Sequence, residues 1–147
     1  MNKKIPELAA YLSKKYATNN PEILASYLGI RIIKEPLEDV VAGFYKMINR
    51  RKYIFLNSDI DDENFLRLVL AHELGHAIMH PKENCAFIRN HTLFLTSRLE
   101  IQANKFAAYF LITDKDIQEY VVEQQYTIDM LSRLWGYEKE LIELRLK

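Results

Sequence analysis

Hydrophobic residues in the first part of the chain recur at helical spacing. Between residues 5 and 17 the apolar positions that share one helical face are Ile5, Leu8, Ala9, Leu12 and Tyr16. Because residues three or four apart lie on the same side of a helix, this spacing predicts an amphipathic helix. Pro21, a residue type favoured in the first turn of a helix, begins a second predicted helix that ends at Gly29.

After Gly29 the pattern changes to short runs of β-branched and aromatic residues, which favour strands. Three such runs, separated by turn-forming residues, lie at residues 30–33, 40–48 and 53–56. They predict three strands, of which the last two form a hairpin. Such a hairpin could offer an edge to which an extended peptide adds as a further strand.

The second half of the chain is predicted to be largely helical. The acidic stretch 58–63 suits the positive end of a helix dipole, so a long helix should start there and end or bend at Pro81. Residues 82–95 are predicted to be a loop with a short apolar hairpin or an irregular segment. Further helices are predicted at residues 97–112, 114–124, 127–134 and 138–147.

These elements predict an α+β fold, a small and mostly helical domain in which a three-stranded sheet packs against the long helix. The length of 147 residues fits one domain over residues 1–147, with a helical C-terminal segment at residues 126–147. In that segment the apolar spacing is typical of helix packing. Its basic residues are matched by acidic ones, which argues against a DNA-binding face.

Composition and charge narrow the classes of function. Lysine and arginine together number 20, as do aspartate and glutamate, so no direct binding of nucleic acid is expected. The longest uncharged apolar run, residues 106–112, is far shorter than the roughly 20 residues that span a bilayer, so no membrane is expected as a partner. A lone cysteine, Cys85, cannot form an internal disulfide, and we expect a cytoplasmic protein.

The long predicted helix contains the HExxH motif His72-Glu73-Leu74-Gly75-His76. Helical positions four apart differ by about 40° in azimuth and about 6 Å along the axis, so both imidazoles can face one metal ion. Glu73, at the edge of the same face, is the candidate general base. Gly75 suits the close approach of a substrate or of a neighbouring element. Taken alone, the five-residue pattern also arises by chance on helices.

A catalytic zinc ion needs a third protein ligand and an open fourth position. Glu100, near the start of the predicted helix at residues 97–112, could project its carboxylate onto the ion. Alternatively, Ser97 and Glu100 could form a capping box, in which the glutamate bonds back to the helix start. His91, in the predicted loop, is a competing third ligand.

Two more polar residues could support the ligands. Asn104, one helical turn after Glu100, could hydrogen-bond a ligating histidine and select its tautomer. His80 continues the stripe of His72 and His76, but three ligands on one straight helix would spread over about 12 Å. We therefore interpret His80 as a support for a ligand or as a helix-end residue, where histidine suits the negative end of the dipole.

Three blocks of the chain resemble the ImmA/IrrE family of metallopeptidases in order, spacing and residue identity. The blocks are residues 54–57, 70–80 and 100–108. The resemblance implies a zincin-like fold in which zinc is held by His72, His76 and Glu100. It also implies that Glu73 takes the proton of the water that attacks a peptide bond.

The same resemblance implies a protein substrate, namely a helix-turn-helix repressor of a phage or mobile genetic element whose cleavage relieves repression. A second hypothesis comes from a different class of function. In that alternative the chain is a non-proteolytic anti-repressor that binds the repressor, and its zinc is structural. The two hypotheses differ in whether fragments of the repressor are produced.

Overall fold

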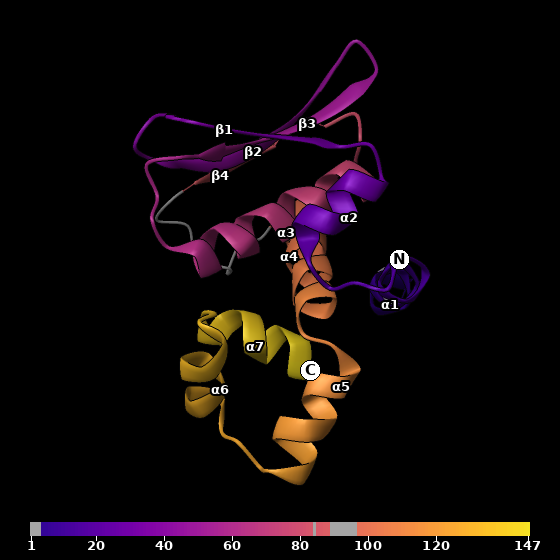
Figure 1. Ribbon diagram of the computed structural model, residues 1–147, viewed down its shortest axis with the longest axis vertical. Coiled ribbons are helices and arrows are strands. Elements are labelled where there is room, and N and C mark those ends of the chain that lie inside the picture. The colour runs from indigo at the N-terminus through magenta and orange to yellow at the C-terminus, as the bar shows by residue number, and fades with distance from the viewer. Residues whose placement is uncertain (1–3, 84, 89–96) are drawn as a thin grey trace.

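A computed structural model describes residues 4–83, 85–88 and 97–147 of the chain. Figure 1 shows a sheet at one end, α3 (Glu63–Met79) packed beneath it, and α4 (Arg98–Leu111) crossing below α3. The C-terminal helices lie at the opposite end from the sheet. The predicted α+β class is confirmed, and α3 is the central layer between the sheet and α4.

Two helices precede the sheet, as the sequence predicts. α1 (Lys4–Tyr16) packs against α4 and buries Ile5, Ala9 and Leu12, three positions of the predicted apolar face. α2 (Pro21–Tyr27) begins after Asn20, whose side chain accepts a hydrogen bond from the backbone of Glu22 at 2.9 Å. That cap satisfies one of the free N–H groups at the helix start, where proline also fits.

The sheet has four strands in the order β1-β3-β2-β4. The strands are β1 (Arg31–Glu35), β2 (Val41–Ile48), β3 (Arg51–Asn57) and β4 (Cys85–Ile88). β2 and β3 form the predicted antiparallel hairpin, and β1 pairs with β3 in parallel. Tyr45, Ile54 and Leu56 are buried where this sheet covers α3.

The expectation of three strands is wrong, because β4 pairs antiparallel with β2. Its residues lie in the segment that the sequence predicts to be a loop with a short hairpin or an irregular stretch. A four-residue strand has little signal of its own, and its partner lies about 40 residues earlier in the chain. The hairpin consequently has no free edge, since β2 and β3 both lie inside the sheet and β1 and β4 end it.

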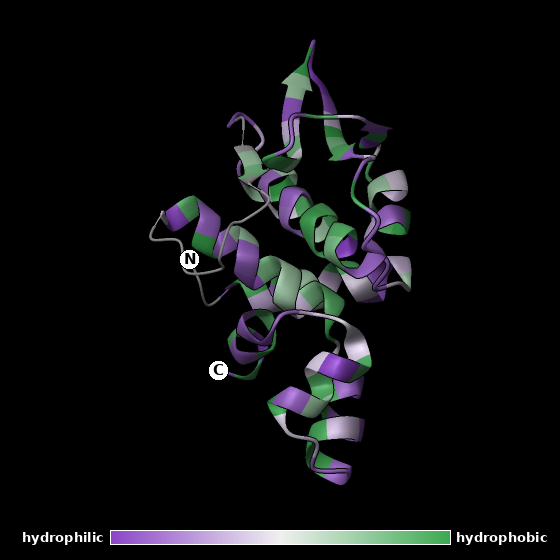
Figure 2. Ribbon diagram, turned by 90° about the vertical axis from the view of Figure 1, so that its left-hand side faces the viewer, coloured by the Kyte–Doolittle hydropathy of each residue, from purple (hydrophilic) through white to green (hydrophobic). Residues whose placement is uncertain are grey.

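The second half of α3 is buried on every side, because the sheet covers one face and α4 another. Residues 68–77 are all buried, and Figure 2 shows hydrophobic stretches on the central helices but mixed colours along the C-terminal ones. Asp62 caps the start of the helix by accepting a hydrogen bond from the backbone of Phe65 at 3.1 Å. It ends at Met79, before Pro81, as predicted.

The sheet also anchors the C-terminal end of α3. The Lys52 ammonium of β3 donates to the carbonyl oxygen of Ala77 at 2.8 Å, where a positive charge suits the helix dipole. The Tyr45 hydroxyl of β2 donates to the carbonyl of Pro81 at 2.6 Å. Two strands therefore hold the half of α3 that carries the HExxH motif.

The C-terminal part is helical, but one predicted helix differs. Residues 114–124 form a single α-helical turn, α5 (Asp114–Asp116), followed by a π-helical segment, η1 (Ile117–Glu123). Helices α6 (Ile128–Trp135) and α7 (Lys139–Leu146) follow, with Gly136 between them in the left-handed conformation that ends α6. Among the residues that the structure describes, no helix is long and apolar enough to cross a membrane.

Arg145 connects α7 to the end of α4. Its Nε donates to the carbonyl oxygen of Ile112 at 2.6 Å, and its guanidinium lies 4.4 Å from the ring centre of Tyr109. It also pairs with Asp114 at 2.6 Å, but that carboxylate is 94% exposed and contributes little. The bond to the buried carbonyl is therefore the important contact.

Replacing this arginine should loosen the C-terminal helices. We expect Arg145→Met to lower the free energy of unfolding by about 2–3 kcal/mol, because a charged donor to a buried carbonyl is lost. Urea denaturation followed by circular dichroism measures this change. Arg133→Met, at an exposed position of α6, is the control and should change stability by less than about 0.5 kcal/mol. Equal effects of the two substitutions would contradict the role assigned to Arg145.

Candidate metal centre

The two histidines of the HExxH motif lie on the face of α3 that meets α4. Both are buried, and their ring centres are 4.9 Å apart. Their placement follows from helical periodicity, since positions 72 and 76 are separated by about one turn. Together with Glu73 they form a buried group whose potential ligand atoms all lie within 4.8 Å of one another.

Glu100 reaches the same point from α4. Its carboxylate oxygen Oε2 is 3.2 Å from Nε2 of His72 and 2.9 Å from Nε2 of His76. The N-cap residue Ser97 makes no side-chain capping bond, and the carboxylate of Glu100 points to the histidines rather than back to the helix start. This geometry favours Glu100 as a possible metal ligand over Glu100 as part of a capping box. The competing residue His91 lies outside the described residues.

Glu73 is fully buried next to the histidines, and its Oε2 is 4.0 Å from Nε2 of His72. The backbone amide of Tyr45 faces this carboxylate and favours its charged form. Even so, neither carboxylate oxygen has a well-formed hydrogen bond to any described residue. A buried carboxylate without partners is costly, so its environment is incomplete unless a ligand or substrate supplies a proton or a charge.

The pKa values of the Glu73 and Glu100 carboxyl groups are shifted in opposite directions. Burial raises the pKa of the Glu73 carboxyl well above its usual value, and the negative charge of Glu100 raises it further. Burial also opposes ionisation of Glu100, but its close contacts with His72 and His76 outweigh burial and hold its pKa far below the usual value. The pKa of His72 is lowered by burial, with a smaller effect from the neighbouring His76.

The outward nitrogens of both histidines also have partners. Nδ1 of His72 lies 2.6 Å from Oδ1 of Asn104, on α4. Nδ1 of His76 lies 3.2 Å from Nδ1 of His80, the residue that ends α3. Nε2 of His80 lies 2.7 Å from Oε1 of Gln102. Apart from His91, which lies outside the described residues, the structure thus brings the predicted site residues together and adds Gln102.

Sequence reasoning missed Gln102 and Phe87. Phe87 of β4 packs edge-on against the His72 ring, with ring centres 4.9 Å apart and planes at 89°. A short apolar run around Phe87 was visible in the sequence, but its pairing with β2 was not. Nothing in the periodicity of α4 distinguishes Gln102 from a surface glutamine, because its partner His80 is on another helix.

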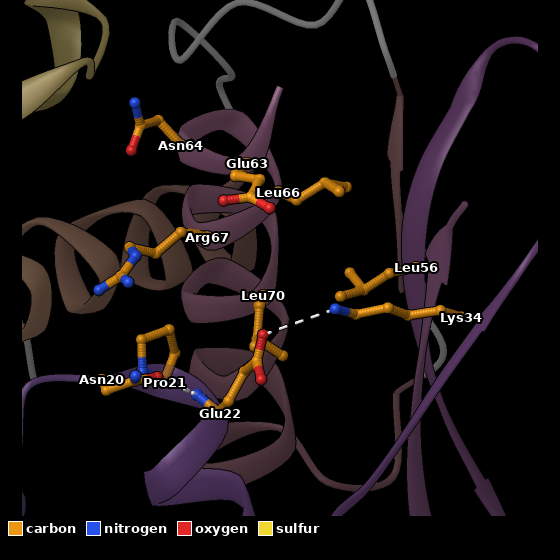
Figure 3. Close-up of a pocket in the computed structure, with 10 residues that line it drawn as sticks. All are labelled: Asn20, Pro21, Glu22, Lys34, Leu56, Glu63, Asn64, Leu66, Arg67 and Leu70. Carbon is orange, nitrogen blue, oxygen red and sulfur yellow. Dashed lines mark hydrogen bonds and ion pairs between the residues drawn. The ribbon is translucent and has the colours of Figure 1, made fainter. Parts of the chain in front are cut away.

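A separate cavity of about 220 Å³ lies on another side of α3, between that helix, α2 and the sheet (Figure 3). Arg67 and Leu70 contribute from α3, and Glu22 and Lys34 form an ion pair across it at 3.6 Å. No residue of the HExxH motif lines this cavity, so it is distinct from the candidate metal centre.

The fold and the site together define a class, an α+β protein with a buried histidine–carboxylate group of the kind that holds a catalytic metal ion. A family model described as the IrrE N-terminal-like domain, of a peptidase family, matches residues 25–147. The chain belongs to this family, which confirms the resemblance to the ImmA/IrrE metallopeptidases.

Two curated proteins are similar to the chain. An "uncharacterized immunity region protein 2" of Bacillus phage phi105 is 39% identical over 134 residues, which cover 91% of this chain and 84% of that protein. "Metallopeptidase ImmA" of Bacillus subtilis (strain 168) is 31% identical over 107 residues, which cover 72% of this chain but less than two thirds, 62%, of that protein. The family therefore implies a metal ion, and His72, Glu73 and His76 could bind one.

Gly75 determines how closely α3 and α4 approach at the site. A Cβ added there would lie 3.2 Å from Cβ of Phe106 and 3.3 Å from Cα of Ala103, closer than ordinary contact. The sequence left open whether Gly75 allows the close approach of a substrate or of a neighbouring element, and these contacts support the approach of a neighbouring helix. Because Glu100 is on α4, the separation of the helices also sets its distance from the histidines.

Larger residues at position 75 should separate these helices. We expect Gly75→Val to lower the free energy of unfolding by about 1–3 kcal/mol through overpacking. In Gly75→Ala a smaller clash is offset by the gain in helix propensity of about 1 kcal/mol, which makes this variant the matched control. The affinity for a divalent metal ion, measured by competition with a chelator, should fall in the order Gly, Ala, Val. Unchanged affinity in a destabilised Gly75→Val protein would show that this packing does not set the site.

Proposed function

We propose that this chain is a zinc-dependent endopeptidase, and the observation that carries the proposal is the convergence of three ligand atoms from two helices. The carboxylate oxygens of Glu100 lie 3.2 Å from Nε2 of His72 and 2.9–3.2 Å from Nε2 of His76. Ligand atoms about 2.0–2.1 Å from a tetrahedral zinc ion are about 3.3 Å from one another. The residues therefore fit such an ion.

Glu100 suits the third ligand position better than Glu73 does. Its oxygens lie 2.9–3.2 Å from both histidine nitrogens, whereas Oε2 of Glu73 is 4.0 Å from Nε2 of His72. Three protein ligands leave a fourth position open, which is typical of catalytic rather than structural zinc. Asn104 accepts a hydrogen bond from Nδ1 of His72, which directs the Nε2 lone pair toward the metal.

A divalent zinc ion, when bound, supplies Lewis-acid activation of a water molecule and of a peptide carbonyl. The chain supplies the proton transfer through Glu73. Its burial favours the protonated carboxyl, so the carboxylate readily takes a proton from the attacking water and then passes it to the leaving amine. Glu100 remains ionised as a ligand, and the opposite environments of two nearby carboxylates separate these roles.

The proposed substrate is a helix-turn-helix repressor of a phage or mobile genetic element. The support is a relative whose name places it in a phage immunity region, together with a second relative named as a metallopeptidase. Cleavage of the repressor would relieve repression. A repressor binds the DNA of the cell, so a protein that cleaves it would be located in the cytoplasm.

Removing the third ligand tests the metal centre. We expect Glu100→Ala to abolish stoichiometric zinc uptake, measured by elemental analysis after dialysis, because two histidines alone cannot hold a catalytic ion tightly. Glu63→Ala removes an exposed carboxylate at the start of α3 and should bind zinc as the wild type does. Full zinc occupancy in the Glu100→Ala protein would remove Glu100 from the ligand set.

Removing the base tests the reaction. Glu73→Gln keeps the volume of the side chain but cannot accept the proton, so we expect repressor cleavage to slow by about 10²–10⁴-fold while zinc content is retained. Cleavage is followed by gel electrophoresis with the helix-turn-helix repressor encoded beside the gene.

The same assay distinguishes the non-proteolytic anti-repressor alternative. If zinc-loaded wild-type protein prevents the repressor from binding DNA without producing fragments, the endopeptidase proposal is wrong. Cleavage at the wild-type rate by Glu73→Gln would instead remove Glu73 from its role as the base.

A further inference from the structure

A line of three polar side chains runs outward from the candidate metal centre. Nδ1 of His76 lies 3.2 Å from Nδ1 of His80, and Nε2 of His80 lies 2.7 Å from Oε1 of Gln102. His76 lies in the last turn of α3, His80 follows directly after that helix, and Gln102 belongs to α4. His76 and Gln102 are buried, so Nδ1 of His76 and Oε1 of Gln102 each need the hydrogen bond that His80 provides.

The positions of the hydrogens along this line follow from the acceptor at its outer end. Oε1 of Gln102 is a carbonyl oxygen that can only accept, so Nε2 of His80 carries the hydrogen. A neutral imidazole has one N–H, which leaves Nδ1 of His80 as an acceptor. Nδ1 of His76 must then donate to it, and the lone pair of His76 is left on Nε2, on the side of Glu100, where the proposed zinc ion would accept it.

We infer that Gln102 is a positioning residue that acts through His80 to hold His76 in the tautomer whose Nε2 can bind the metal ion. The inference rests on the proposed function, in which Nε2 of His76 is a zinc ligand. The other ligating histidine is held directly, by Asn104 at 2.6 Å. His76 instead needs an intermediary, because its outward nitrogen faces His80 rather than α4.

One helix therefore supplies both the proposed third ligand and the two amides that orient the histidines. Glu100, Gln102 and Asn104 all belong to α4. Residues 100 and 104 share a face that meets His72 and His76, whereas residue 102 points to a different side and reaches the end of α3. The packing of α4 against α3 thus positions the proposed third ligand and, at the same time, selects the tautomers of the two histidines.

A structural role for these side chains must be separated from the orienting role. Gln102 and His80 line a cavity of about 460 Å³ together with Met79 and Leu99, so a substitution could act by changing the wall of that cavity. The discriminating property is the acceptor oxygen at position 102. A side chain of similar size without that oxygen should impair zinc binding, and one that keeps the oxygen should impair it less.

Zinc affinity measured by chelator competition tests this distinction. We expect Gln102→Leu to weaken zinc binding about tenfold, at the lower end of the range for residues that orient metal ligands. Gln102→Glu keeps an acceptor oxygen for Nε2 of His80 and should bind zinc more tightly than Gln102→Leu. Leu99→Met alters the same cavity wall without a polar change and should bind zinc normally. Equal affinity of wild type and Gln102→Leu would overturn the inference.

A double-mutant cycle tests whether the effect passes through His80. His80→Leu removes the acceptor for His76 and should weaken zinc binding about 10–100-fold. Adding Gln102→Leu to that variant should cause no further loss, because the connection is already broken. Losses that multiply in the double variant would show that Gln102 acts independently of His80 and would overturn the inference.

Nitrogen-15 NMR of the zinc-loaded protein reads the tautomers directly. In the wild type we expect the hydrogen of His80 on Nε2 and a scalar coupling between the Nδ1 atoms of His76 and His80 across their hydrogen bond. A hydrogen on Nδ1 of His80 would contradict the inference. If the wild-type protein takes up no zinc, the proposed function fails. If the wild-type protein binds zinc and the Gln102 and His80 variants bind it equally well, the orienting role fails and the proposed function stands.

Discussion

The close packing of α4 on α3 is the contact on which the rest of the site depends. Gly75 permits it, because a side chain there would meet Phe106 and Ala103 at less than ordinary contact distance. The sheet fixes the same half of α3 from the other side through Lys52 and Tyr45. A histidine pair on one helix can hold a metal ion only if the third ligand is held at a matching distance, and interiors packed this tightly set such distances.

Ionisable side chains are buried at this contact, although burying such groups usually costs free energy. The region around residues 68–77 is apolar on nearly every side, yet it encloses two imidazoles and a carboxylate. Most of these groups are satisfied by one another or by amides of α4, whereas Glu73 faces only the backbone amide of Tyr45 and has no well-formed hydrogen bond to a described residue. A local violation of the rule that buried polar groups are paired is expected where chemistry is performed.

Much of the fold follows from local patterns. Apolar spacing around α1 and α3, proline at the start of α2, and β-rich runs at β1, β2 and β3 are properties of neighbouring residues, so the sequence predicts these elements well. The fourth strand and the π-helical segment η1 were not predicted. β4 is only four residues long and exists because β2 offers it a partner, and η1 occupies a stretch whose apolar spacing also suits an ordinary helix.

The sequence by itself determined that His72 and His76 share a helical face with Glu73 beside them, because a five-residue motif on a helix has only one geometry. Only the tertiary structure decided that Glu100 meets those histidines instead of capping its own helix, since both arrangements are compatible with the local sequence. It also decided that Gln102 reaches His80 and that Phe87 covers His72. These contacts join residues on different elements, and their energies exist only once the helices and the sheet have packed together.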